Sequence, residues 1–171
     1  MNKQTLSVIA FILAALITTW SVVRFLKRPP VETPLEPAVV LQERIESAQP
    51  LEVRVEAARR LARHGVQARQ EIRQVFQTAR AQEETEVLLP IMTAIGESRE
   101  WKEIPSLVEL MRHPDIRVRG RAGAIAQRLI GADYGFRAEL PEAESNAVIA
   151  KIEEALPVMQ PRLQEFYGND E

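Results

Sequence analysis

Three glycines, Gly65, Gly96 and Gly131, divide the chain at similar intervals, and this spacing is the strongest constraint on its fold. Each follows a run of apolar residues at helical period, which is the usual place of the residue that ends a helix. The intervals are 31 and 35 residues. A period of this length is typical of stacked helix pairs. No stretch alternates apolar and polar residues as a strand would, so the sequence predicts an all-α fold.

Residues with high helix propensity dominate the chain after residue 37, and prolines add further breaks between the apolar runs. Together the breaks predict seven helical segments. They are residues 38–48, 51–64, 67–81, 85–95, 103–112, 115–130 and 142–156.

The clearest helix pair lies in residues 104–131. Its first helix carries a short apolar stripe, and the turn Arg112-His113-Pro114-Asp115 places Asp115 as an N-cap for the second helix. In that second helix the apolar and small residues recur on one face. These are Val118, Ala122, Ile125, Ala126 and Leu129.

This pair resembles the HEAT-repeat family, whose signature is a Pro-Asp turn, a Val-Arg pair, an Ala, apolar positions and a final Ile-Gly. The matching residues are Pro114, Asp115, Val118, Arg119, Ala122, Ile125, Ala126, Ile130 and Gly131. Moving back 65 residues gives an internal echo in Val53, Arg54, Ala57 and Arg63. The echo departs from the family at Leu51, where Asp is favoured, and at Arg60, where an apolar residue is expected.

The resemblance implies a short α-solenoid of about three HEAT-like helix pairs over residues 38–131. It also implies structural repeat roles for Asp115, Val118, Arg119, Ala122 and Arg54, with the two arginines bridging neighbouring repeats. Residues 132–171 are then expected to form a connector, a C-terminal capping helix and an acidic tail. The second helix of each pair is expected to line the concave side.

An apolar run precedes these helices. Residues 6–23 contain no charge, no proline and no glycine, and a helix of 18 residues spans roughly 27 Å, close to the thickness of the hydrocarbon core. Residues 1–28 are therefore predicted to be a single-pass transmembrane anchor with a basic flank, and residues 29–37 a proline-rich linker. A cleaved signal peptide remains the alternative, although its apolar core is usually shorter. The flanking cations mildly favour a cytoplasmic C-terminal part, and the opposite orientation stays open.

The composition argues against several kinds of chemistry. The chain has no cysteine, and its two histidines, His64 and His113, stand at predicted helix ends. No catalytic or phosphate-binding motif is present, so we expect no catalytic residue, metal or cofactor. The part after residue 28 holds 18 basic and 24 acidic residues, which argues against a nucleic-acid partner.

One charged stripe stands out on the helix predicted for residues 115–130. Arg117, Arg121 and Arg128 fall on the same side of this helix, away from its apolar face, and no acid lies among them. Guanidinium groups so placed suit carboxylates on a protein partner or phosphates of anionic lipid. An ordinary solvated face is the alternative.

The sequence therefore predicts a membrane-tethered scaffold or adaptor that binds a protein partner through its repeat surface and performs no catalysis. A structural subunit of a larger membrane complex is the first alternative. A HEAT-like lyase or modifying protein is the second, and it would need an acid–base or metal cluster that the sequence does not display.

Overall fold

The computed structural model describes residues 35–168. These residues form helices and contain no strand, which confirms the prediction of an all-α protein. Within the same range, no helix is both long and apolar enough to cross a membrane. The membrane helix predicted at residues 6–23 lies outside the described residues, so it stays a prediction.

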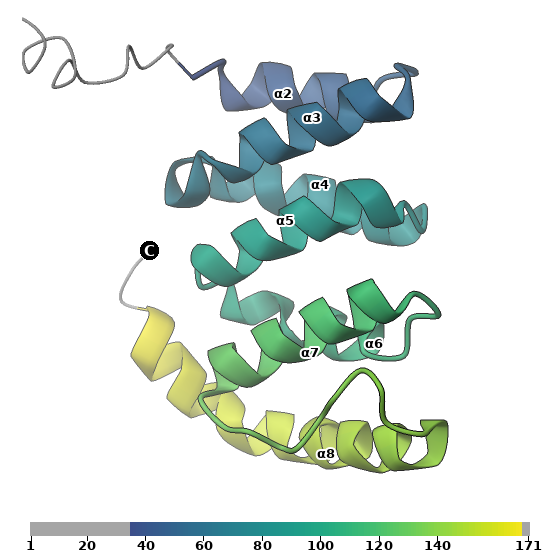
Figure 1. Cartoon of the computed structure of the whole chain (residues 1–171). Helices are drawn as coiled ribbons and strands as arrows, with labels where there is room; N and C mark the ends of the chain where they lie inside the picture. Colours follow the sequence, from purple (N-terminus) through teal and green to yellow (C-terminus); the bar gives the residue numbers. More distant parts are fainter. Residues whose placement is uncertain (1–34, 169–171) are drawn as a thin grey trace, which may run out of the picture. The chain divides into compact units, whose positions relative to one another are not determined.

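The helices come in antiparallel pairs joined by short turns (Figure 1). Two short 3₁₀ helices, Gly65–Ala68 and Trp101–Glu103, directly precede α4 and α6. The α-helices are α2 (Ala38–Glu46), α3 (Leu51–Ala62), α4 (Arg69–Ala81), α5 (Thr85–Glu97), α6 (Ile104–Leu110), α7 (Ile116–Ile130) and α8 (Glu142–Tyr167).

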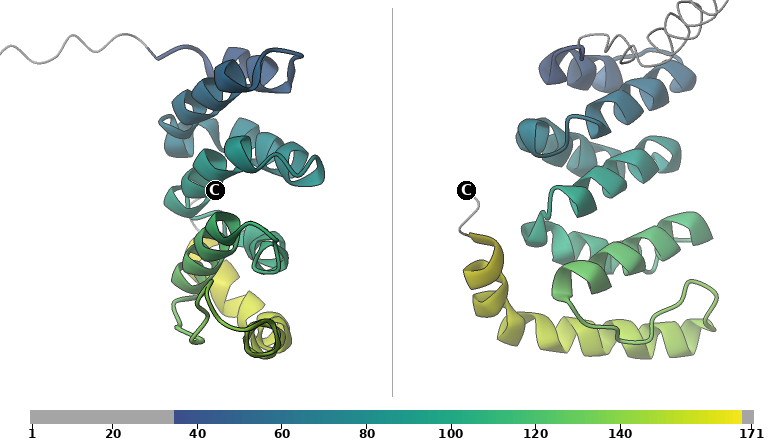
Figure 2. Two further views of the ribbon diagram at one scale, coloured as in Figure 1. Left: turned by 45° about the vertical axis from the view of Figure 1, so that its right-hand side comes forward. Right: turned by 60° about the vertical axis from the view of Figure 1, so that its left-hand side comes forward.

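The pairs α2/α3, α4/α5 and α6/α7 stack in chain order, and the stacking forms two layers. In one layer α5 packs against both α3 and α7, whereas α2, α4, α6 and α8 follow one another in the other layer (Figure 2). A single helix pair cannot bury its apolar face, so each pair gains most of its burial from its neighbours.

A continuous core runs between the two layers. Phe76, Leu61 and Met92 are fully buried in the first two pairs, and Met111 and Ile149 continue the core towards α8. Removing one such side chain from water contributes about 1.5–3 kcal/mol. The core therefore extends without interruption from the first pair to the capping helix.

Of the three punctuating glycines, Gly131 ends a helix as the sequence predicts, whereas Gly65 follows the end of α3 at Ala62 and begins the first 3₁₀ helix. Gly65 and Gly131 have φ angles of 53° and 76°, and Gly131 is the left-handed C-cap of α7. A side chain is strained in this region, so glycine is the favoured residue at both positions.

The prediction for Gly96 is wrong, because this glycine lies inside α5 and is buried. A Cβ at this position would stand 2.3 Å from Nη2 of Arg128 and 3.0 Å from Cγ2 of Ile125. Gly96 therefore allows α7 to approach α5 closely. The left-handed residue that follows α5 is Arg99, with a φ of 55°, and the NH of Glu100 bonds back to the carbonyl of Ile95.

The capping helix α8 is longer than predicted, since it passes through Pro157 and Pro161 and ends at Tyr167 instead of residue 156. Each proline removes a backbone donor, and the helix bends in its second half (Figure 2). Tertiary contacts hold this half in place: Leu163 is buried, and Oη of Tyr167 donates to the carbonyl of Leu129 at 3.1 Å.

The connector between α7 and α8 packs on α7 through Phe136, which is 3% exposed. The ring lies directly over Gly123, where a Cβ would stand 2.4 Å from the ring carbon Cδ1. One helical turn earlier, a Cβ on Gly120 would meet only the Cβ of Ala138, at 3.3 Å. The absent side chain at residue 123 therefore makes room for the connector.

We expect Gly123→Ala to destabilise residues 35–171 by about 1–3 kcal/mol, because the new methyl group must displace the buried ring of Phe136. Gly120→Ala is the matched control in the same helix. There the better helix propensity of alanine is expected to raise the free energy of unfolding by about 1 kcal/mol. Urea unfolding of both variants measures the difference. Equal stability of the two variants would contradict this packing.

Candidate interaction surface on α7

The second helix of the third pair begins at Asp115, the N-cap of α7. Its backbone is extended, with φ −74° and ψ 119°, and Oδ1 accepts a hydrogen bond from the NH of Arg117 at 2.8 Å. The NH of Asp115 itself donates to Nδ1 of His113 at 3.0 Å. Nδ1 of His113 thus accepts a backbone hydrogen bond within the turn.

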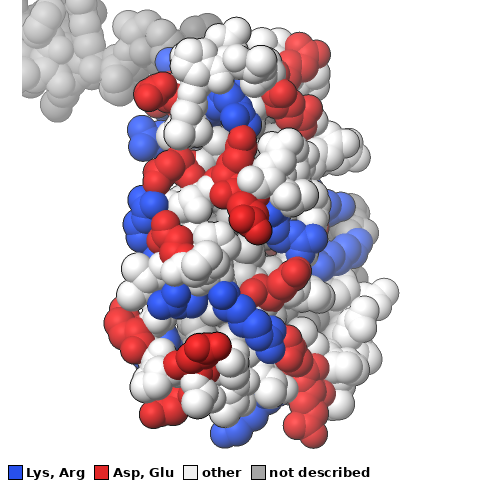
Figure 3. Space-filling view, turned by 90° about the vertical axis from the view of Figure 1, so that its right-hand side faces the viewer, with Lys and Arg blue, Asp and Glu red and all other residues white. Residues whose placement is uncertain are grey.

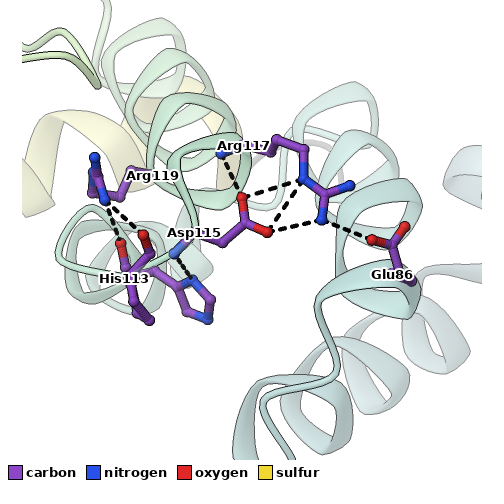
Figure 4. Close-up of polar contacts among 6 residues, drawn as sticks. Glu86, His113, Asp115, Arg117 and Arg119 are labelled. Atoms are coloured by element: carbon purple, nitrogen blue, oxygen red, sulfur yellow. Dashed lines mark hydrogen bonds and ion pairs between the residues drawn. The ribbon is translucent and has the colours of Figure 1, made fainter.

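Arg117 lies between two carboxylates (Figure 4). Its Nη2 is 2.8 Å from Oδ2 of Asp115 and 2.7 Å from Oε1 of Glu86 on α5. The side-chain and backbone hydrogen bonds from Arg117 lower the pKa of Asp115 to about 2, and the two acids raise the pKa of Arg117. Arg117 therefore ties α7 to α5 and is already compensated within the protein.

The other two arginines of the predicted stripe also face α5. Nη1 of Arg121 donates to Oγ1 of Thr93 at 2.7 Å. The guanidinium of Arg128 lies over Gly96, and it has no hydrogen bond or ion pair to any described residue. Of the three predicted contact residues, Arg128 is thus the one whose charge has no partner within residues 35–168.

The two arginines assigned to the repeat framework occupy equivalent positions, four residues after the N-caps of α3 and α7. Nε of Arg54 donates to the carbonyl of Ile45, and the guanidinium forms a two-pronged pair with Glu84, the N-cap of α5. Arg119 bonds the carbonyls of His113 and Pro114 at 3.0 and 2.9 Å. Each arginine thus fixes the turn before its own helix.

Both arginines also reach the next unit, because Arg54 binds Glu84 and Nη2 of Arg119 donates to the carbonyl of Ala138 at 3.0 Å. In α5 the equivalent residue is the fully buried Leu88, which cannot bind the carboxylate of Asp115. Arg117 makes that link instead, with the acid on α5 and the base on α7. Between the first and second pairs the arginine is on the earlier pair, whereas between the second and third pairs it is on the later one.

The remaining framework residues, Val118 and Ala122, are fully buried on the opposite face of α7. Small side chains at residues 122 and 126 keep this face of α7 narrow where it meets its neighbours. α7 therefore has one face committed to the core and a second, polar face turned towards α5 and solvent.

A buried acidic pair lies in the other layer. Glu100 and Glu103 are 4% and 6% exposed, and Nη2 of Arg73 lies 2.7 Å from Oε2 of Glu100. Burial raises the pKa of Glu103, whereas the charge of Arg73 acts in the opposite direction. Arg69 also binds Glu100, with 3.1 Å between Nε and Oε1. These contacts link α4 to the start of α6, and the side chain of Ser106 also bonds Glu103.

The surface of the turns within each pair shows acidic and basic side chains interleaved, with neither sign gathered in a large patch (Figure 3). Within residues 35–168 no group of three or more His, Asp or Glu side chains is placed to hold a metal ion. This surface thus carries mixed charges and no large patch of one sign.

A groove opens at the end of α7, with a volume of about 1040 Å³. Its walls are the last turn of α7, the start of the connector and the second half of α8. Arg128 lines it together with Arg162, Tyr134, Met159 and Phe166. Arg162 was missed by the sequence analysis because the predicted capping helix ended at residue 156. The heptad position of Leu163 after Leu156 was the available signal for a longer helix.

Comparison of the chain with protein-family models, with curated proteins and with solved structures finds no match.

We expect Asp115→Asn to lower the stability of residues 35–171 above about pH 4 and to have a shrinking effect as the pH falls towards 2. Asparagine keeps the N-cap and removes the charge, so it isolates the contact with Arg117. The pKa of Asp115 is lowered to about 2 in the folded state, so its stabilising contribution is present above its ordinary pKa and is lost through this pH interval.

The measurement is the urea midpoint of both proteins from pH 7 to pH 2. A difference in midpoint that does not change over this range would show that the charge of Asp115 does not contribute.

Proposed function

We propose that the protein is a membrane-tethered scaffold or adaptor that holds a protein partner on a short HEAT-like α-solenoid and performs no catalysis. The observation that carries the proposal is the stack of three helix pairs in one register. The N-caps Glu84 and Asp115 and the buried valines Val87 and Val118 occupy matching places in α5 and α7. Repeats of this kind build extended surfaces for binding proteins.

The polar contacts in the stack support a scaffold over an enzyme. The acids that are buried or strongly perturbed are each bound by arginine: Glu100 by Arg73, Glu103 by Arg73 and Asp115 by Arg117. An acid held in this way strengthens packing between helices and is a poor general base. The candidate contact surface is the polar face of α7 with Arg121 and Arg128, whereas Arg117 acts mainly within the protein.

The tether is proposed from the apolar run at residues 6–23. We expect the full chain to stay in the membrane pellet after carbonate extraction, because a transmembrane helix is removed by detergent and not by high pH. A variant lacking residues 1–28 is expected in the supernatant. Release of the full chain by carbonate would remove the transmembrane anchor from the proposal.

Partner binding on α7 is tested by crosslinking in intact cells with a photoreactive amino acid at Ala124, which is exposed on α7 between Arg121 and Arg128. We expect a discrete crosslinked product from this position. The matched control carries the same amino acid at Ala150, which is exposed on α8 and lies away from the contact surface. Equal products from both positions, or none from residue 124, would contradict the proposed surface.

A structural subunit of a larger membrane complex is the second candidate, favoured by the N-terminal end of the stack. Val53 is 40% exposed, whereas Val87 and Val118 at the equivalent helix position are fully buried. Leu35, Val39 and Leu51 are exposed on the same pair. An apolar repeat end usually needs a cap. Crosslinks from Val39 within a stable, stoichiometric assembly would favour this candidate over the adaptor.

A further inference from the structure

Almost every arginine in residues 35–168 is bound within the protein, and the exceptions are informative. Ion pairs or hydrogen bonds to carboxylates, carbonyls or a hydroxyl hold the others, and Arg59, Arg60 and Arg63 share Glu56. Arg99, Arg128 and Arg162 have no such partner among the described residues. Two of these three, Arg128 and Arg162, line the same groove at the end of α7.

The backbone of α7 does not satisfy these guanidinium groups. A helix C-terminus normally offers free carbonyls to nearby cations. Here the NH of Gly131 bonds the carbonyls of Gln127 and Arg128, at 2.9 and 3.2 Å. Oη of Tyr167 donates to the carbonyl of Leu129 at 3.1 Å. The carbonyls at this end of α7 are therefore largely occupied, and the two arginines remain available to a ligand from outside.

The rest of the groove is apolar and aromatic. Phe166 is 70% exposed and stands edge-on to Tyr167, with 4.8 Å between the ring centroids. Met159 lines the same wall and accepts a contact from Oη of Tyr134 at 3.4 Å. An exposed aromatic ring beside a thioether offers an adaptable site for an apolar side chain.

We infer that this groove binds an acidic peptide segment of a protein partner, with carboxylates at Arg128 and Arg162 and an apolar side chain against Phe166. Guanidinium groups bind carboxylates in a two-pronged geometry, which suits charges fixed on a helix face. The groove also contains Glu165, so its net positive charge is small. Nucleic acid requires a larger basic footprint, and the apolar wall favours a peptide over a bare phosphate.

The inference rests on the proposed adaptor function and names the chemistry of its partner. It is tested with the full chain in detergent micelles and an array of fluorescein-labelled peptides in which Asp or Glu is combined with Leu or Phe in random order. A matched array carries Asn and Gln in place of the acids. We expect binding by acidic peptides that contain Leu or Phe, and no binding by their amide counterparts.

The variants Arg128→Glu and Arg162→Glu are each expected to weaken the best acidic peptide by about tenfold or more, because each removes a charged hydrogen-bonded contact and adds repulsion. Arg99→Glu is the control with the same change of charge, at an arginine that also has no partner within residues 35–168 but lies outside the groove. It should bind like the wild type. Phe166→Ser should weaken the binding of acidic peptides that contain Leu or Phe. The amide peptides should still not bind to this variant.

Three results would overturn the inference: no acidic peptide binding better than its amide counterpart, equal loss in Arg99→Glu, or tighter binding of anionic vesicles or single-stranded DNA that depends on Arg128. The first two would leave the adaptor proposal standing if Ala124 still crosslinks a partner in cells. Peptide binding in the micelles without any crosslink from Ala124 would contradict the partner surface and leave the groove intact.

Discussion

The packing of α5 between α3 and α7 is the contact on which the rest of the structure depends. It requires a close approach, which Gly96 permits by leaving room for Ile125 and for the guanidinium of Arg128. Once α5 and α7 are this close, polar side chains on the two helices come within bonding distance of each other. The ion pair between Glu86 and Arg117 follows from that proximity.

Arginine has two different tasks in this protein. Arg54 and Arg119 each bond the turn before their own helix and then reach the next unit, so they set the spacing between pairs. Such contacts use several donors at once, which only a guanidinium group provides in a fixed plane. Arg128 and Arg162 differ from these two, because they line a groove and have no partner within residues 35–168, and the proposed ligand contact rests on them.

The sequence predicts the helices well because their apolar period and their turn residues agree. Asp115 begins α7 and Gly131 ends it, and both depend on interactions within a few residues. Gly96 was assigned to a helix end on the same reasoning, yet its small size serves a neighbour 29–32 residues away in the chain. The local sequence pattern does not show whether a glycine ends a helix or makes room for a neighbouring helix.

The candidate site was less predictable, for the same physical reason. Periodicity places Arg117, Arg121 and Arg128 on one side of a helix, but it cannot show that Glu86 and Thr93 lie opposite the first two. Nor does it extend α8 through two prolines, because contacts of Leu163 and Tyr167 with the rest of the stack override the lost backbone bonds. A bent capping helix thus brings Arg162 to the end of α7, where a straight helix ending at residue 156 would leave Arg128 on an open surface.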